Sequence, residues 1–351
     1  MHVPRHRSHV IKPRPLRGSE RGHRVSKVLA CLGAVAFFAS IGLPACKPAP
    51  RDRDRGLSTA PPQSATDAIA PGPPRRTRLG GTDVTFLVAS DLHFGFGYPD
   101  DLKKLSADAF AQPVGLESAN RVLVTRMNAL SGHAYPSDVG GFVTRPRGVL
   151  VTGDLTEWGR KEEWDRFVSY FGLTGKEGAL RLPVFEAVGN HDKIHGPWIE
   201  EQVAIRHGGR FYAWDWDDLH LVSLGEAPDD EGLAWLARNL DGLARDVPII
   251  LYFHRALLGP WSEDNWFGDG TYRDRLAKIL QDHMVLAIFH GHHHAAGHYL
   301  WHGIDVYKPG AVKDDAHTLA VVHVTDSNAT VAYYNYDDDA WTKSFQKKQP
   351  R

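Results

Sequence analysis

Short apolar runs rich in β-branched residues alternate with amphipathic stretches from Gly80 onward. This alternation predicts a layered α/β domain. Helices are predicted where apolar residues recur at helical spacing, over residues 116–130, 160–171 and 230–245. Strands are predicted at the apolar runs 84–90, 148–152, 184–188, 219–224, 248–253, 284–289, 304–307, 319–324 and 330–334.

Residues 1–46 have the pattern of an export signal. Residues 1–27 are rich in Lys and Arg, and residues 28–43 form an uncharged apolar run, shorter than the roughly 20 residues of a membrane-spanning helix. Leu43-Pro44-Ala45-Cys46 resembles a bacterial lipobox, in which cleavage precedes a cysteine that becomes lipidated. Ordinary cleavage near Ala45 is the alternative. Residues 47–79, rich in Pro, Ser, Ala and charge, are predicted to be a disordered tether before a folded domain at 80–351.

The charge and the cysteine content of this domain restrict which partners and which metal ligands are expected. Residues 1–78 carry 15 Lys and Arg against four Asp and Glu, a net charge of +11, whereas residues 79–351 have a net charge of −12. An acidic domain lacks the positive field that non-specific nucleic-acid binding requires, so no nucleic-acid partner is expected. Because both cysteines, Cys31 and Cys46, precede the domain, any metal in it is expected to bind nitrogen and oxygen ligands.

Five polar clusters directly follow predicted strands. Ligand sites in open α/β sheets form outside the carboxyl ends of the strands, so the clusters are expected to converge. Each cluster alone has a plainer explanation, such as turn chemistry or a hydrogen-bonded core histidine. Their order, each at a strand end, favours one shared site. The clusters are Asp91-Leu92-His93, Gly153-Asp154, Gly189-Asn190-His191-Asp192, His254 and Gly291-His292-His293-His294.

The ligand types in these clusters indicate metal ions. Carboxylate, amide and imidazole without sulfur suit Zn, Mn or Fe. Two ions about 3.5–4 Å apart that share a carboxylate would polarise a phosphoryl group and generate hydroxide from bound water, which is the chemistry of phosphoester hydrolysis. Residues i and i+2 of an extended segment point the same way, so each D-x-H or H-x-H pair is expected to face one site. The glycines at 153, 189 and 291 are expected to let side chains approach closely.

The motifs D-x-H, G-D, G-N-H-D, H and G-H-x-H, in this order over about residues 83–310, resemble those of the calcineurin-like metallophosphoesterases. The resemblance implies an α/β fold, a four-layer α-β-β-α sandwich of two mixed β-sheets flanked by helices. It also implies two divalent or trivalent metal ions (Mn, Fe or Zn), bridged by Asp154. The ligands of the first ion would be Asp91, His93 and His294, and those of the second Asn190, His254 and His292.

The same resemblance implies roles for two residues that are not metal ligands. His191 would lie near the substrate phosphate, to stabilise charge or protonate the leaving oxygen, and Asp192 would orient it. The Leu-Thr-Glu-Trp that follows Asp154 departs from the family, in which many members carry another polar residue soon after this aspartate. His290 and His293 are additional imidazoles; His293 is expected to face outward, because it points opposite to its neighbours.

Residues beside the motifs suggest where a substrate is held. Lys193 and Arg255 are candidates for binding a non-reacting phosphate group, with an ordinary surface position as the alternative. Residues 94–147 are longer than a simple connection and are expected to contribute a cap. Trp214 and Trp216 are expected in the edge strand of a hairpin. Aromatic residues in loops near the motifs either stack on a substrate ring or pack in the core; they are Phe94, Phe96, Tyr98, Trp198, Trp261 and Trp266.

These features predict an exported hydrolase of small phosphorylated compounds. A phosphomonoesterase is the first hypothesis, and a phosphodiesterase of cyclic-nucleotide or glycerophosphodiester type is the alternative. A non-catalytic metal- or ligand-binding lipoprotein is the alternative of another class. It is weakened by the complete ligand set together with His191, because a binding protein needs no proton donor. The expected location is the bacterial cell envelope, with the membrane contacted only through a lipidated Cys46; a secreted or periplasmic soluble protein is the alternative.

Overall fold

The computed structural model describes residues 76–97, 115–262, 267, 270–314 and 316–349. The predicted export signal, Cys46 and the larger part of the predicted tether lie outside the described residues, as do Tyr98 and Trp266. Among the helices of the described residues, none is both long and apolar enough to cross a membrane.

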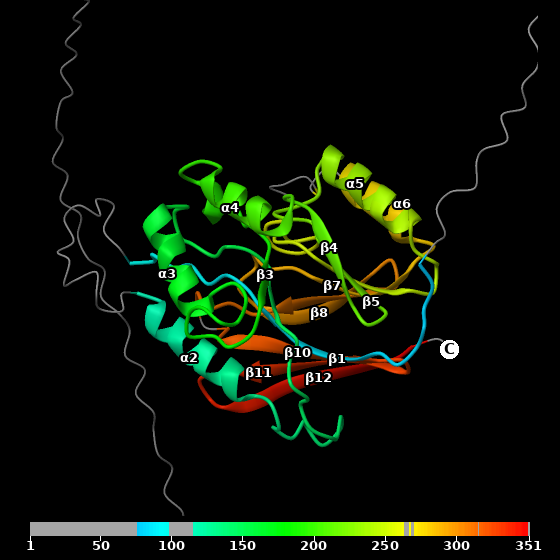
Figure 1. The fold of residues 1–351 in the computed structure, drawn as a ribbon, viewed down its shortest axis with the longest axis horizontal. Helices are drawn as coiled ribbons and strands as arrows, with labels where there is room; N and C mark the ends of the chain where they lie inside the picture. The colour runs from blue at the N-terminus through cyan, green and yellow to red at the C-terminus, as the bar shows by residue number, and fades with distance from the viewer. Residues whose placement is uncertain (1–75, 98–114, 263–266, 268–269, 315, 350–351) are drawn as a thin grey trace, which may run out of the picture. The chain divides into compact units, whose positions relative to one another are not determined.

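Two six-stranded mixed sheets form the centre of the domain (Figure 1). The first has the strand order β12-β11-β10-β1-β2-β3, in which β1, β2 and β3 are parallel. Its strands are β1 (Asp83–Ala89), β2 (Val149–Val151), β3 (Val184–Glu186), β10 (Thr318–Thr325), β11 (Asn328–Asn335) and β12 (Ala340–Lys348).

The second sheet has the order β4-β5-β6-β7-β9-β8, in which β5, β6, β7 and β9 are parallel and the edge strands β4 and β8 are antiparallel to their neighbours. Its strands are β4 (Tyr212–Trp216), β5 (Leu219–Ser223), β6 (Pro248–Tyr252), β7 (Met284–Phe289), β8 (Ala296–Trp301) and β9 (Ile304–Pro309).

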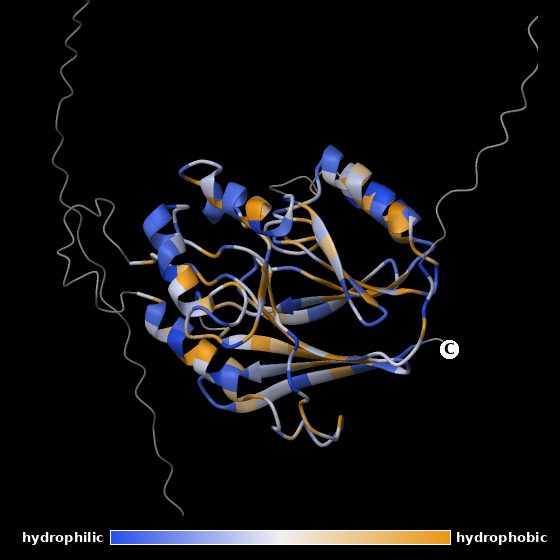
Figure 2. Cartoon of the chain, in the orientation of Figure 1, coloured by the Kyte–Doolittle hydropathy of each residue, from blue (hydrophilic) through white to orange (hydrophobic). Residues whose placement is uncertain are grey.

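Helices cover the outer face of each sheet. Figure 1 shows α2 and α3 together on one side and α5 beside α6 on another, and Figure 2 shows hydrophobic and hydrophilic residues on these helices, as one buried face requires. The helices are α2 (Glu117–Ala129), α3 (Lys161–Phe171), α4 (Trp198–His207), α5 (Asp230–Asp241) and α6 (Thr271–Leu280), with a short 3-10 helix η2 (His191–Lys193).

Alternate residues of the central strands enter different apolar layers. In β1, Phe86 and Val88 pack between the two sheets, whereas Leu87 packs beneath α2 and α3. In β6, Tyr252 packs between the sheets and Leu251 packs beneath α5 and α6. Because successive side chains of a strand point to opposite faces, a strand buried on both faces is apolar throughout. The predicted four-layer sandwich is confirmed.

The structure confirms the nine predicted strands and the three predicted helices, with small changes at their ends. α5 ends at Asp241 rather than at residue 245, because the chain after Gly242 pairs with Arg76, whose N–H donates to the Gly242 carbonyl oxygen at 3.0 Å. The expected hairpin edge is β4, which pairs with β5. Helices α4 and α6 and strands β8 and β12 were not predicted from the sequence. β12 is a largely exposed strand with three polar residues at its end, so it has no apolar run.

Candidate functional site

The five polar clusters converge where parallel strands of both sheets end. β1, β2 and β3 end together in the first sheet, and β6 and β7 end together in the second. We call seven residues that meet there the candidate metal centre: Asp91, His93, Asp154, Asn190, His254, His292 and His294. Ligand atoms within 4.8 Å of one another are offered by the groups Asp91-His93-Asp154-His294, Asp154-His254-His292 and His93-Glu157-His191.

In the first half of the centre, two imidazoles and two carboxylates face one point. Nε2 of His93 lies 3.3 Å from Nε2 of His294 and 3.6 Å from Oδ2 of Asp154. His294 Nε2 also lies 3.4 Å from Oδ1 of Asp91. The other ring nitrogens contact carboxylates: His93 Nδ1 is 2.7 Å from Oε2 of Glu157, and His294 Nδ1 donates to Oδ2 of Asp314 at 2.7 Å. Carboxylates at these positions orient imidazole ligands and raise their basicity.

In the second half, the imidazoles have other partners. His254 Nδ1 donates to the Thr152 carbonyl oxygen at 2.9 Å, which leaves Nε2 facing Oδ1 of Asn190 at 3.0 Å. His292 Nε2 lies 3.4 Å from a guanidinium nitrogen of Arg255. The second half therefore has a neutral carbonyl and a cation where the first half has two carboxylates.

Asp154 lies between the two halves. Its Oδ1 accepts a hydrogen bond from the backbone N–H of His191 at 2.9 Å. Its Oδ2 is buried without a hydrogen-bond partner in the described part of the chain, 3.3 Å from His254 Nε2. A buried, unpartnered carboxylate oxygen costs free energy unless a cation satisfies it. The donor set thus fits a pair of metal ions that share Asp154.

The charges of the centre favour bound cations. Burial opposes ionisation of Asp154, but the neighbouring His254 and His93 outweigh it, so the pKa of Asp154 lies well below its usual range. Burial of Asp91 is likewise outweighed by His294 and His254, and its pKa is lowered. Burial lowers the pKa of His254, yet Asp154 and Asp91 raise it to about 9. Two ionised, fully buried carboxylates require positive charge beside them, which His254 supplies without metal and which bound metal ions would supply in its place.

The backbone at the centre adopts the left-handed conformation. Ten non-glycine residues of the described chain have a positive φ, and five of them belong to the centre. This conformation costs an L-residue about 1–3 kcal/mol and is typical of functional sites. The extended backbone expected for the i, i+2 pairs is therefore wrong, and the pairs share a face because both members have turned backbones. The five residues of the centre with a positive φ are Asp91 (φ 53°), His93 (45°), Asp154 (50°), His292 (68°) and His294 (48°).

Two glycines permit this close packing, as predicted. A Cβ on Gly189 would lie 2.3 Å from the backbone nitrogen of Asp154, and a Cβ on Gly291 would lie 2.0 Å from Oγ of Ser90. Neither contact is possible for a real side chain, so the loops after β3 and β7 approach the centre only with glycine at these positions.

His191 lies beside His93 at the centre, whereas Asp192 has different surroundings from those the resemblance implies. His191 Nδ1 donates to the backbone carbonyl oxygen of Glu157 at 2.7 Å, and its ring lies edge-on to His93 with centroids 4.7 Å apart. Asp192 accepts hydrogen bonds from the N–H groups of Leu155, Thr156 and Gly189 and from the Thr156 hydroxyl. The expectation that Asp192 orients His191 is wrong: the Glu157 carbonyl holds the ring, and Asp192 ties the loop after β2 to the loop after β3.

Sequence reasoning missed three residues that hold the site. Glu157 contacts His93 and accepts from Nζ of Lys313 at 3.2 Å, and Asp314 contacts His294. The one signal for Glu157 is its place three residues after Asp154, in the Leu-Thr-Glu-Trp segment that departs from the family pattern. No motif marks Lys313 or Asp314.

The two predicted substrate cations share one carboxylate. Arg255 Nε donates to Oε1 of Glu226 at 2.8 Å, and Lys193 forms an ion pair with Oε2 of the same residue. Glu226 is buried, and sequence reasoning missed it. In the sequence, Lys193 follows Asn190 by three residues and Arg255 directly follows His254. Because both side chains pair with Glu226, neither is an isolated positive charge.

The predicted aromatic residues divide between core and surface. Phe94 is buried against Phe167 and Phe171, and Trp198 packs edge-on to Trp164. Phe96 and Trp261 stay 40% and 48% exposed. Helix α2, within the segment 94–147 that was expected to contribute a cap, is not part of a cap, because it buries Leu123, Val124 and Met127 in the core. Residues 98–114 of the same segment lie outside the described chain, and a cap there stays a prediction.

The additional histidines are held away from the centre. His290 is buried, with Nε2 2.8 Å from the Tyr299 hydroxyl, and burial lowers its pKa to about 4. His293 is partly exposed and accepts a hydrogen bond from Nζ of Lys308 at 2.7 Å. Its side chain thus has a partner of its own outside the ligand groups.

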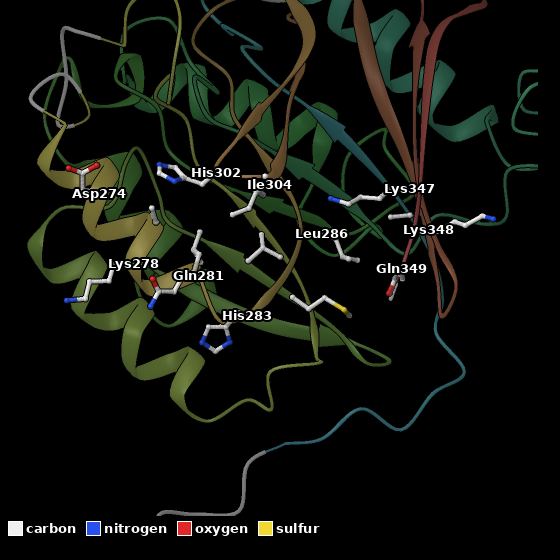
Figure 3. A pocket seen from close by; sticks show the side chains of 16 residues that line it. Asp274, Lys278, Gln281, His283, Leu286, His302, Ile304, Lys347, Lys348 and Gln349 are labelled. Carbon is white, nitrogen blue, oxygen red and sulfur yellow. The ribbon is translucent and has the colours of Figure 1, made fainter. Parts of the chain in front are cut away.

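A cavity of about 580 Å³ lies elsewhere in the domain (Figure 3). Its walls include Lys278 of α6, Leu286 of β7, Ile304 of β9 and Lys347 of β12. It lies at the amino end of β7, whereas the candidate metal centre follows the carboxyl end of that strand. The cavity is therefore separate from the site.

Three solved structures have a similar fold. A dimetal phosphatase from Danio rerio aligns with a TM-score of 0.51 at 12% identity, covering 75% of this chain and 98% of that chain. A purple acid phosphatase from yellow lupin (Lupinus luteus) seeds aligns at 0.52 and 14%, covering 78% and 54%. GAP50, described as the anchor in the inner membrane complex of Plasmodium, aligns at 0.52 and 9%, covering 77% and 90%. At such identities the likeness concerns the fold.

Comparison with protein sequences identifies a family. No curated protein matches the chain. Residues 84–296 match calcineurin-like phosphoesterases, and this range holds all five polar clusters. The match spans more than half of the chain, so the chain belongs to the calcineurin-like phosphoesterase family and is a metallophosphoesterase.

Proposed function

We propose that this protein hydrolyses small phosphomonoesters at a two-metal centre. The observation that carries the proposal is the buried Asp154 carboxylate, which belongs to two groups of potential ligands and has an unpartnered Oδ2. One ion would be held by Asp91, His93, Asp154 and His294, and the other by Asp154, Asn190, His254 and His292. We propose Mn, Fe or Zn as the ions, because these metals suit nitrogen and oxygen ligands.

We infer that His191 donates a proton to the leaving group. When bound, two metal ions supply positive charge that polarises a phosphoryl group. His191 Nδ1 donates to the Glu157 carbonyl oxygen, so Nε2 is the ring atom left to exchange a proton with substrate. The side chain is 25% exposed, which lets a leaving oxygen reach it. A protonated Nε2 would donate to the departing alcohol oxygen.

The cation beside the second half supports a monoester. A guanidinium nitrogen of Arg255 lies 3.4 Å from His292, and Lys193 shares its Glu226 partner. A monoester dianion carries more negative charge than a diester, so it gains more from cations near the centre. Lys193 and Arg255 are the residues proposed to contact the non-reacting oxygens of the substrate.

The test compares hydrolysis of p-nitrophenyl phosphate and bis-p-nitrophenyl phosphate by the purified protein with added Mn or Zn. We expect metal-dependent turnover that favours the monoester, is lost in Asp154→Ala and is strongly reduced in His191→Ala. His323→Ala is the matched control, because that histidine binds Asp83 away from the centre. Faster hydrolysis of the diester would overturn the proposal that phosphomonoesters are the substrates. Tight metal binding with hydrolysis of neither ester would favour a binding protein.

We also propose that the protein is exported and held at a bacterial membrane by a lipidated Cys46. The basic residues 1–27, the apolar run 28–43 and the Leu-Pro-Ala-Cys sequence support this. Cell fractionation tests it: Cys46→Ser is expected to move the protein from the membrane to the soluble fraction. An unchanged distribution would favour ordinary cleavage and a periplasmic or secreted product.

A further inference from the structure

Trp261 occupies a backbone position that normally suits glycine. Residues 259–262 form a turn in which the Ser262 N–H donates to the Gly259 carbonyl oxygen at 3.2 Å. Pro260 is the second residue of this turn, and Trp261, with a φ of 62°, is the third. A turn with proline second and a positive φ third is of type II, and its third residue is usually Gly or Asn. A tryptophan there is a strained outlier, which points to a function for the side chain.

The indole of Trp261 stands over the last histidine cluster of the centre. Its ring centroid lies 5.6 Å from that of His292, 5.8 Å from that of His293 and 5.9 Å from that of His294, each nearly edge-on. Trp261 is nevertheless 48% exposed. The ring thus contacts two candidate metal ligands and keeps part of its surface open to solvent.

Further exposed apolar side chains lie next to motif residues. Seven large hydrophobic residues are exposed in the described chain. Besides Trp261, these include Phe96 and Ile194, which are 40% and 47% exposed and follow His93 and His191 by three residues. Exposed apolar groups that adjoin a polar site are typical of ligand pockets, in which polar groups fix the ligand and apolar groups bind its body.

Phe96 is also joined to the centre by its contacts. Nζ of Lys313 lies 5.1 Å from the centroid of the Phe96 ring, and the same amine donates to Glu157, the carboxylate beside His93. Phe96 therefore adjoins the first half of the centre, whereas Trp261 contacts both His292 of the second half and His294 of the first.

We propose that Trp261 is a specificity-determining residue that stacks on a flat ring in the alcohol part of the substrate, with Phe96 contributing to the same apolar rim. The substrate class is a phosphomonoester of a nucleoside or another alcohol that carries an aromatic ring. The inference rests on the proposed function, because it takes the phosphate to lie at the candidate metal centre. Stacking of a base on an aromatic side chain contributes about 1–3 kcal/mol, or about fivefold to a hundredfold in affinity.

The test compares two primary alkyl phosphates, adenosine 5′-monophosphate and glycerol 1-phosphate, which share the type of bond broken and differ in the ring. We expect the protein to favour the adenosine ester in kcat/KM. Trp261→Ala is expected to lower kcat/KM about fivefold to a hundredfold for adenosine 5′-monophosphate, mainly through KM, and less than twofold for glycerol 1-phosphate. Trp261→Phe is expected to restore most of the loss. Leu300→Ala is the control, since Leu300 is 63% exposed on β8.

A binding measurement separates this inference from the proposed function. Calorimetric titration with adenosine needs no turnover, and its binding is expected to weaken in Trp261→Ala. Trp261-dependent binding of adenosine without hydrolysis of either ester would support the ring site and overturn the phosphomonoesterase. Hydrolysis of both esters with equal losses in Trp261→Ala would overturn the ring site and assign Trp261 to packing on the histidines, with the phosphomonoesterase intact.

Discussion

The two halves of the candidate metal centre are held by different kinds of partner. In the first half, His93 and His294 each contact a carboxylate, of Glu157 and Asp314. In the second half, His254 donates to a backbone carbonyl, and His292 lies beside a guanidinium. A carboxylate makes an imidazole a more basic ligand, whereas a nearby cation opposes a metal ion. We therefore expect the first half to bind its ion more tightly, so that a chelator empties the second half first.

The substitution Asp154→Ala is expected to have the largest effect, because it removes the ligand that both halves share. Loss of one bridging carboxylate should lower kcat/KM about a thousandfold or more, since the two ions supply several kcal/mol of stabilisation together. Metal analysis of the variant should also find fewer than two bound ions. The isosteric Asp154→Asn separates loss of charge from loss of volume. Two tightly bound ions in Asp154→Ala would show that Asp154 does not join the halves.

Glu157→Gln is expected to weaken the first half alone. The Glu157 side chain is 8% exposed, so its charge acts on His93 with little screening by solvent. Loss of such a partner typically lowers metal affinity about 10–100-fold. Chelator competition should show this shift for the tighter ion and none for the weaker one. Glu177→Gln, an exposed glutamate bonded to Thr174, is the matched control. An equal loss at both ions would contradict the assignment.

Asp314→Asn tests the same half at the other histidine, with a smaller effect. The Asp314 side chain is 63% exposed, so solvent screens its charge. The affinity for the tighter ion is expected to fall about twofold to fivefold in the same competition assay. If Asp314→Asn lowered the affinity for this ion more than Glu157→Gln does, burial would not determine which carboxylate contributes more to metal binding.

Arg255→Ala is expected to act in the opposite direction and on the second half. Removal of the guanidinium beside His292 relieves its repulsion of a cation, so the weaker ion should bind about twofold to fivefold more tightly. The KM for a monoester should rise in the same variant, because a substrate cation is lost. Arg275→Ala, at an exposed ion pair with Asp230, is the control. Weaker binding of the second ion would contradict the comparison.

The converging clusters could be predicted because each follows a strand that is buried on both faces. The interior of such a strand is largely apolar, so the first charged residue after it, such as Asp91 or Asp154, marks its end in the sequence. Asp314, the partner of His294, and Glu226, the partner of Arg255, were not predicted from the sequence. Their positions depend on how loops from different strands meet, which no local periodicity records.

Backbone conformation and strand exposure set the other limits of prediction. The left-handed turns at His93 and His292 arise in histidine, which adopts a positive φ only in a minority of cases, unlike glycine, so the residue type does not predict them. Edge strand β8 has only Trp301 buried, and its sequence lacks the apolar alternation of the central strands. Helix α6 buries Leu276 and Leu280 alone, too few to give a helical pattern.

The five left-handed residues of the centre also bear on how such a site is lost over evolution. A left-handed L-residue costs about 1–2 kcal/mol, and glycine at the same position is free of that cost. Replacement of His93 or His294 by glycine would abolish a ligand while it relaxes the backbone. Relief of this strain would offset part of the stability that is lost with the buried side chain. In a lineage no longer selected for catalysis, loss of such a ligand to glycine would therefore cost the sandwich less stability than loss of an equally buried side chain with an ordinary backbone.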